Sequence, residues 1–160
     1  MTRTWMFLAG LALVACGSDD EKGGDTGATD PNAELNAELT DLIEGYDAWP
    51  QVEAGIVPSA AVHGEYVENW LNTPAKAVVD AQAGEAMPDG AILVKQGYDD
   101  ELGDSEKNLT VMWKTDGEWF WAQYNSGGDL TKSGFQLDGC VECHEGDAGQ
   151  QDDGVISYDW

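Results

Sequence analysis

The feature that most restricts the fold of this chain is a pair of β-rich segments on either side of Asp116-Gly117. Leu109–Lys114 and Trp119–Tyr124 are rich in β-branched and aromatic residues, which favour strands. An Asp-Gly pair between two such segments predicts a tight β-hairpin. We therefore expect a sheet that is built from hairpins and not from βαβ units.

The residues ahead of this hairpin predict two helices and two more strands. Apolar spacing and capping residues indicate the helices, and β-favouring segments bounded by turns indicate the strands. The elements are a helix from residue 33 with Leu35, Leu39, Leu42 and Ile43 on one face, a strand over residues 59–72, a helix with Thr73 as its N-cap, Pro74 at its first position and Gly84 as its stop, and a turn and strand over residues 88–98. We expect a loop over residues 126–134 and a last short strand over residues 154–160. The predicted fold class is α+β, with a mainly antiparallel β-sheet and two or three helices.

The charge of the chain restricts its partners. The 160 residues include 31 acidic and 7 basic side chains, for a formal net charge of −24. Nucleic-acid binding needs a basic surface, so we expect no nucleic acid as a partner. Small neutral ligands and basic proteins are compatible with this charge. The length fits one domain with a hydrophobic core.

The first 15 residues have the form of a signal peptide. Arg3 precedes an apolar segment that ends at Ala15 and is shorter than the 20 or so residues that span a bilayer. The sequence LVAC around Cys16 resembles a bacterial lipobox, in which the cysteine is acylated; the alternative is an ordinary signal with an incidental cysteine. Gly17 in place of an aspartate favours the outer membrane. We expect lipid anchoring on the periplasmic side, an acidic flexible tether over residues 16–32 and a folded domain over residues 33–160.

The sequence CVECH at residues 140–144 has the Cys-x-x-Cys-His spacing of a c-type haem attachment site. Cys140 and Cys143 can each form a thioether with one haem vinyl group, and His144 can then bind the iron. The alternatives are a thioredoxin-like motif, a structural zinc site, which needs four ligands, and a plain disulfide. We expect one covalent haem c near the C-terminal end.

Outside the predicted signal peptide, the sequence offers three conventional candidates for the second axial ligand: His63, Met87 and Met112. Met112 lies in a strand segment and fits the core, and Met87 precedes Pro88 in a turn. His63 can face the haem, or it can be a hydrogen-bonded structural histidine. We expect a five-coordinate iron with an open distal side, which would bind small molecules.

The haem motif follows a β-rich, Trp-rich domain, and in this respect the chain resembles the cytochrome P-460 and cytochrome c′-beta family. The resemblance covers residues 47–160 and is also carried by VHGEYVENWLN, MPDGAILVK and VMWKTDGEWFWAQY. It implies an antiparallel β fold, often a homodimer, with His144 as the proximal ligand. In members that oxidise hydroxylamine, a lysine is bound covalently to the porphyrin, and Lys95 is at the matching position. The alternative for Lys95 is an ordinary solvent-facing strand lysine.

The resemblance also implies two kinds of activity. Cytochrome P-460-like members oxidise hydroxylamine, with accompanying nitric oxide chemistry, whereas cytochrome c′-beta-like members bind nitric oxide or carbon monoxide in an apolar pocket. Active oxidases have a distal carboxylate where this chain has Thr110, and a hydroxyl cannot act as a base near neutral pH. Glu106 and residues 99–101 are other candidates for that base.

Three hypotheses for function follow. The chain can be an oxidoreductase that takes electrons from hydroxylamine or nitric oxide and passes them to a partner cytochrome. It can be a gas-binding protein without turnover, or an electron carrier in which His63 closes the sixth position on the iron.

Overall fold

The computed structural model describes residues 30–59, 62–81 and 86–144. The predicted signal peptide, Cys16, most of the tether, Gly84 and the predicted last strand lie outside these residues. Among the helices that are described, none is long and apolar enough to cross a membrane.

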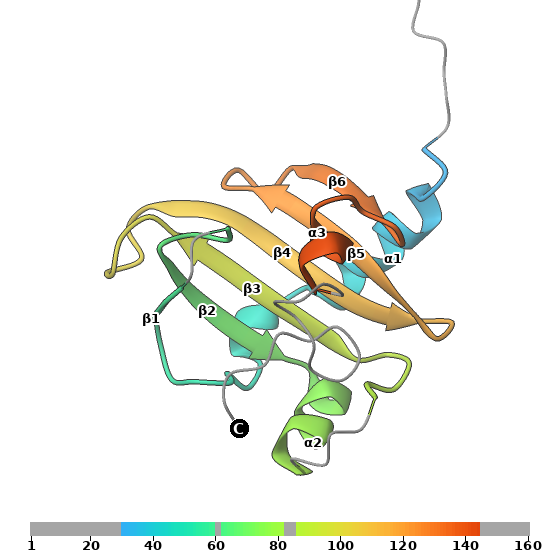
Figure 1. Ribbon diagram of the computed structural model, residues 1–160, viewed down its shortest axis with the longest axis horizontal. Coiled ribbons are helices and arrows are strands. Elements are labelled where there is room, and N and C mark those ends of the chain that lie inside the picture. The colour runs from blue at the N-terminus through green and yellow to red at the C-terminus, as the bar shows by residue number, and fades with distance from the viewer. Residues whose placement is uncertain (1–29, 60–61, 82–85, 145–160) are drawn as a thin grey trace, which may run out of the picture.

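Six antiparallel strands form one sheet and follow one another in chain order (Figure 1). They are β1 (Val57–Pro58), β2 (Tyr66–Leu71), β3 (Ile92–Tyr98), β4 (Glu106–Thr115), β5 (Glu118–Asn125) and β6 (Leu130–Gly134). The helices are α1 (Ala33–Leu42), α2 (Thr73–Ala81) and α3 (Cys140–His144), with a 3₁₀ turn η1 (Tyr46–Ala48). The predicted α+β class and the antiparallel sheet are confirmed.

The predicted hairpin joins β4 to β5 with Thr115 opposite Glu118. Its two turn residues have positive φ angles, 52° at Asp116 and 79° at Gly117, as a type I′ turn requires. The Gly117 N–H also donates a 2.8 Å hydrogen bond to the Asp89 carboxylate, which ties the turn to the segment before β3. The hairpin thus fixes the register in the middle of the sheet.

Three sequence predictions are wrong in detail. β2 begins at Tyr66, and the residues before it, including the exposed Val62, form a loop that carries His63. The segment predicted as a loop over residues 126–134 contains β6, whose backbone pairs with β5 although its side chains are mostly exposed. A polar edge strand of this kind lacks the apolar alternation that marks a strand in sequence.

The third difference concerns the start of α2. The side chain of Asn72, and not that of Thr73, caps the helix, because its Oδ1 accepts a 3.2 Å hydrogen bond from the Ala75 N–H. The same Oδ1 accepts from the Ile92 N–H at 2.9 Å, and Nδ2 donates to the Gly90 carbonyl at 2.7 Å. Asn72 therefore joins the helix start to the start of β3.

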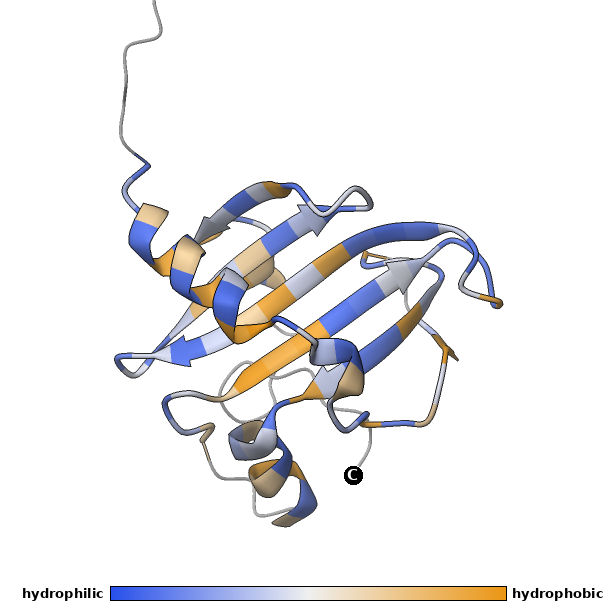
Figure 2. Ribbon diagram, turned by 180° about the vertical axis from the view of Figure 1, so that it is seen from behind, coloured by the Kyte–Doolittle hydropathy of each residue, from blue (hydrophilic) through white to orange (hydrophobic). Residues whose placement is uncertain are grey.

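Each face of the sheet has its own apolar cluster, because neighbouring strand residues point to opposite faces. One face packs against α1, where Leu39 and Ile43 are buried while Leu42 is 41% exposed, so the predicted helix face is wrong at Leu42. The other face is covered by α2 and α3. In Figure 1 α3 lies in front of the sheet and α1 behind it, and Figure 2 shows α1 crossing apolar strand residues from the back.

Candidate haem site

A cavity lies on the face of the sheet that α3 covers. It encloses about 730 Å³, including solvent space at its mouth. Residues of β2 to β5, α2, α3, the loop before β2 and the segment before β1 line it, and most of them are apolar. The lining residues are Val52, His63, Asn69, Trp70, Leu71, Val79, Leu93, Val94, Lys95, Thr110, Val111, Met112, Trp121, Ala122, Cys140 and His144. Ligand sites of proteins typically have this composition, apolar walls with a few polar groups.

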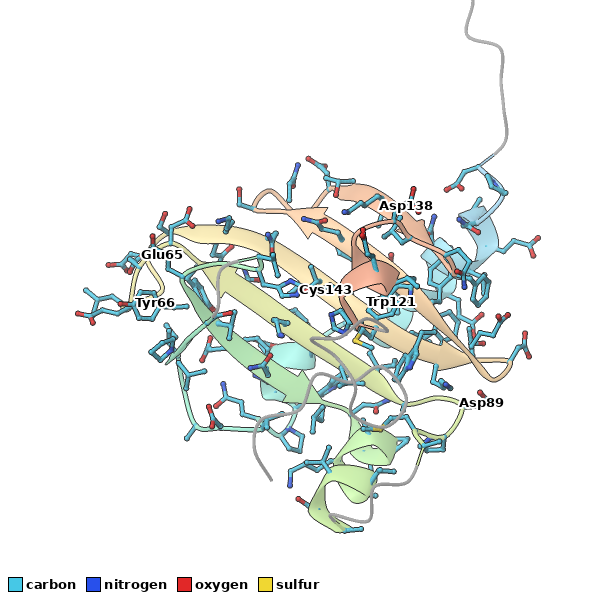
Figure 3. The ribbon with its side chains drawn as sticks, viewed as in Figure 1. Glu65, Tyr66, Asp89, Trp121, Asp138 and Cys143 are labelled. Atoms are coloured by element: carbon cyan, nitrogen blue, oxygen red, sulfur yellow. The ribbon has the colours of Figure 1, made fainter. Side chains whose placement is uncertain are left out.

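The predicted haem motif forms α3 and directs its histidine into this cavity. His144 is 7% exposed, and its ring packs edge-on against Trp121 with ring centres 4.8 Å apart. The N–H groups of Cys140 and Val141 both donate to the Leu137 carbonyl, which closes the first turn. Figure 3 shows Trp121 and Cys143 close to α3 on the side of the sheet that faces the viewer.

The two cysteines of α3 are free thiols, so the disulfide alternative is not seen here. Cys140 lies in the cavity wall, and burial is the main cause that raises the pKa of its thiol. Two reduced cysteines are the groups that thioether formation with a c-type haem requires.

His63 lies in the same cavity, across from His144. The two ring centres are 6.2 Å apart and the ring planes make an angle of 74°. Nδ1 of His63 lies 3.3 Å from Oγ1 of Thr110, within hydrogen-bond distance. Burial, with smaller contributions from the cationic side chains nearby, lowers the pKa of His63 to about 3. The ring is therefore neutral near pH 7, and it lies within hydrogen-bond distance of Thr110 in the same cavity as His144.

Lys95 also lies in the cavity wall, between Asn69 on β2 and Thr110 on β4. Burial lowers the pKa of its amine, and the nearby Cys143 opposes that shift. Lys95 is therefore not the ordinary solvent-facing strand lysine that the sequence left as an alternative. A buried lysine has more neutral amine near pH 7 than an exposed one, and the neutral amine is the nucleophilic form.

The other candidates divide between the cavity and the rest of the molecule. Met112 and Thr110 line the cavity, whereas Met87 is buried in the apolar cluster beside it. Glu106 and residues 99–101 are not in the lining, and no carboxylate is among the lining residues that the structure describes. The alternative proton acceptors that the sequence offered are thus not brought to this site.

Sequence reasoning did not single out Trp121 or Asn69 as site residues. The alternation of β5 places Trp121 in the cavity and its neighbour Phe120 on the α1 face, so the alternation itself was the available signal. Asn69 is paired with Lys95 in the sheet, and nothing in the sequence gives that register.

The donor set fits a c-type haem. Two thiols one helical turn apart, an imidazole on the same helix and apolar walls are what this group requires. Within the described part of the chain, no three side chains of His, Cys, Asp or Glu are grouped so that they could hold a metal ion on their own. A haem iron needs only one or two protein ligands, since the porphyrin supplies the others.

Comparison of the chain with known proteins gives no further assignment. No model of a known protein family matches it, and no curated protein matches it. The resemblance to the cytochrome P-460 and cytochrome c′-beta family rests on the residues and segments named above.

Proposed function

We propose that this chain is an exported, lipid-anchored c-type haem protein that binds small neutral ligands at its iron and exchanges electrons with a partner cytochrome. Cys140 and Cys143 would hold the haem, and His144 would be the proximal ligand. The observation that supports this most is the position of His144, buried against Trp121 in a mostly apolar cavity with Cys140 in its wall. Cys16 would carry the lipid, which anchors the protein on the periplasmic side, with the outer membrane favoured.

When bound, a haem supplies a redox-active iron that takes up small ligands. The chain supplies the surroundings. Trp121 packs edge-on against the His144 ring and limits its rotation, and the apolar part of the walls disfavours water near it. The polar groups of His63, Asn69 and Thr110 can contact a small ligand without presenting it a negative charge. Hydroxylamine and nitric oxide are neutral, so the acidic surface does not repel them.

Oxidation of hydroxylamine or nitric oxide is the second candidate function, and the position of Lys95 favours it. In the resembling oxidases the matching lysine is bound to the porphyrin, and here Lys95 is a half-buried cavity residue with a lowered pKa. Oxidation of hydroxylamine also releases protons, and an ionised carboxylate is an effective acceptor for them. The described lining, which is mostly apolar with the polar side chains of His63, Asn69 and Thr110, supports ligand binding and electron transfer, and we therefore place these first.

Optical spectroscopy of the holoprotein tests whether ligand binding or oxidation is the function. The chain from Cys16 onward, with that cysteine replaced by serine, is produced together with haem-attachment machinery and titrated with nitric oxide and with hydroxylamine. We expect saturable spectral changes and no sustained reduction of an added electron acceptor by hydroxylamine. Sustained turnover that is lost in Lys95→Arg would instead establish the oxidase.

A further inference from the structure

We propose that His63 is the second axial ligand of the haem iron and that Thr110 positions it, so that small ligands reach the iron by displacing His63. This inference rests on the proposed function, because it requires the haem. The sequence predicted an iron with an open distal side, whereas here His63 would close that side. Three features of the site support it: the spacing of the two imidazoles, the hydrogen bonds around Thr110, and the fit of the loop before β2 against β3.

The spacing of the two imidazoles matches that of two ligands on one metal. A histidine nitrogen lies about 2 Å from the metal it binds and the ring centre ~1 Å behind it, so two opposed axial imidazoles place their ring centres about 6 Å apart. The ring centres of His63 and His144 are 6.2 Å apart across the cavity. No other histidine is present in the chain.

The hydrogen bonds around Thr110 fix which nitrogen of His63 is available. The Thr110 hydroxyl donates its single proton to the backbone carbonyl of Lys95, 3.4 Å away, because that carbonyl can only accept. The hydroxyl oxygen is then left to accept from Nδ1–H of His63 at 3.3 Å. In a neutral ring with Nδ1 protonated, Nε2 carries the free lone pair. A metal-bound histidine usually has this arrangement, with its other nitrogen donating to a fixed acceptor.

The backbone of the loop before β2 fits closely against β3, and this fit sets where His63 lies. A Cβ at Gly97 would be 1.7 Å from the His63 carbonyl oxygen, so only glycine allows the approach. Gly64 has a φ of 153°, and a Cβ there would lie 2.7 Å from both the N and the O of Tyr98. Two glycines on two segments are thus both needed to bring the His63 backbone this close to the cavity wall.

The consequence is a control on ligand entry. An iron closed by His63 would transfer electrons without taking up ligands, and a neutral lone-pair donor such as nitric oxide or carbon monoxide would bind only after His63 had left. The rate of binding should then reach a plateau as ligand concentration rises, because dissociation of His63 becomes limiting. An open iron would show a rate that keeps rising in proportion to concentration.

The spin state of the ferric holoprotein tests the proposal. We expect electron paramagnetic resonance to show low-spin iron in the wild type and high-spin iron in His63→Ala, with haem still attached by intact mass. Added imidazole should return His63→Ala to low spin. The matched control is Met112→Leu, which removes the other conventional ligand of the cavity and should stay low-spin.

Thr110 is tested as a positioning residue. Thr110→Val removes the acceptor for Nδ1–H, so we expect a mixture of spin states and at least a tenfold faster plateau rate for carbon monoxide binding to the reduced protein. Thr110→Ser keeps the hydroxyl and should therefore show the wild-type spin state and the wild-type plateau rate. A wild type that is high-spin with haem attached would overturn the proposal and leave the proposed function intact, and so would low spin that persists in His63→Ala. A protein that attaches no haem would overturn both.

Discussion

Replacing Gly97 by alanine should move His63 without touching its side chain. The new Cβ would lie 1.7 Å from the His63 carbonyl oxygen, whereas real Cβ contacts are essentially never below 3.0 Å, so one of the two segments must shift by about 1.3 Å. The hydrogen bond from His63 to Thr110 is already 3.3 Å long, so a shift of that size in the His63 segment that lengthens it would break it. The imidazole would then lose both its hydrogen bond and its position opposite His144.

The magnitude of the effect follows from the cost of overpacking. Such substitutions cost about 1–3 kcal/mol, and a chain of this size loses about 2–4 °C of melting temperature for each kcal/mol. We therefore expect Gly97→Ala to melt about 2–12 °C below the wild type and, as the holoprotein, to gain a high-spin signal. Circular dichroism on heating and electron paramagnetic resonance measure the two effects.

The matched control for this experiment is Gly128→Ala in the turn between β5 and β6. Gly128 has a φ of 82°, and a Cβ there meets nothing within 4 Å, so alanine adds backbone strain of about 1 kcal/mol without a clash. It should lower the melting temperature slightly and leave the spin state unchanged. A Gly97→Ala protein with the wild-type melting temperature and the wild-type spin state would refute the reasoning.

Three further predictions concern stability. Phe120→Ala removes a side chain with no exposed surface and should cost about 3–5 kcal/mol in the free energy of unfolding by denaturant. Asn72→Ala removes three hydrogen bonds and should cost about 2–4 kcal/mol, whereas Asn72→Asp keeps both bonds to Oδ1 and should cost about 1 kcal/mol; equal losses would contradict the capping role. The pKa of His63 is about 3 in the folded chain and about 6.5 in the unfolded chain. Between these values only the unfolded chain is protonated at His63, so the haem-free protein should lose up to about 1.4 kcal/mol of stability for each unit that the pH falls. His63→Gln should reduce this slope, and an unchanged slope would show that His63 is not buried as a neutral ring.

The sequence predicted the parts of the fold whose cause is local. The β4–β5 hairpin was recognisable because Asp116 and Gly117 both tolerate positive φ, and the flanking segments have strong β preference. β6 was missed because an edge strand needs only backbone pairing on one side, and its polar side chains carry no periodic signal. The exposure of Leu42 was missed for another reason. Apolar spacing predicts which side chains share one face of α1, but it does not show which of them the sheet covers.

The same difference between local and long-range causes applies to the candidate site. The Cys-x-x-Cys-His motif at residues 140–144 is contiguous, so the hypothesis of a haem site could be made from sequence alone. The approach of His63 to His144 could not be predicted, because it depends on the close contact of the loop with Gly97, which is far from both in sequence. Trp121 could have been placed on the sheet face that α3 covers, because side chains alternate along β5, but only once it was known which β5 residues point to that face.

The intact mass of the purified protein tests the central claim most directly. The chain is produced with haem-attachment machinery, and the wild type is compared with a variant in which Cys140 and Cys143 are both alanine. Covalent attachment predicts a wild-type mass higher by one haem that survives acid and organic solvent, and no such increase in the variant. A wild-type protein with the bare mass of its polypeptide, obtained under conditions where a known c-type cytochrome is loaded, would contradict the account.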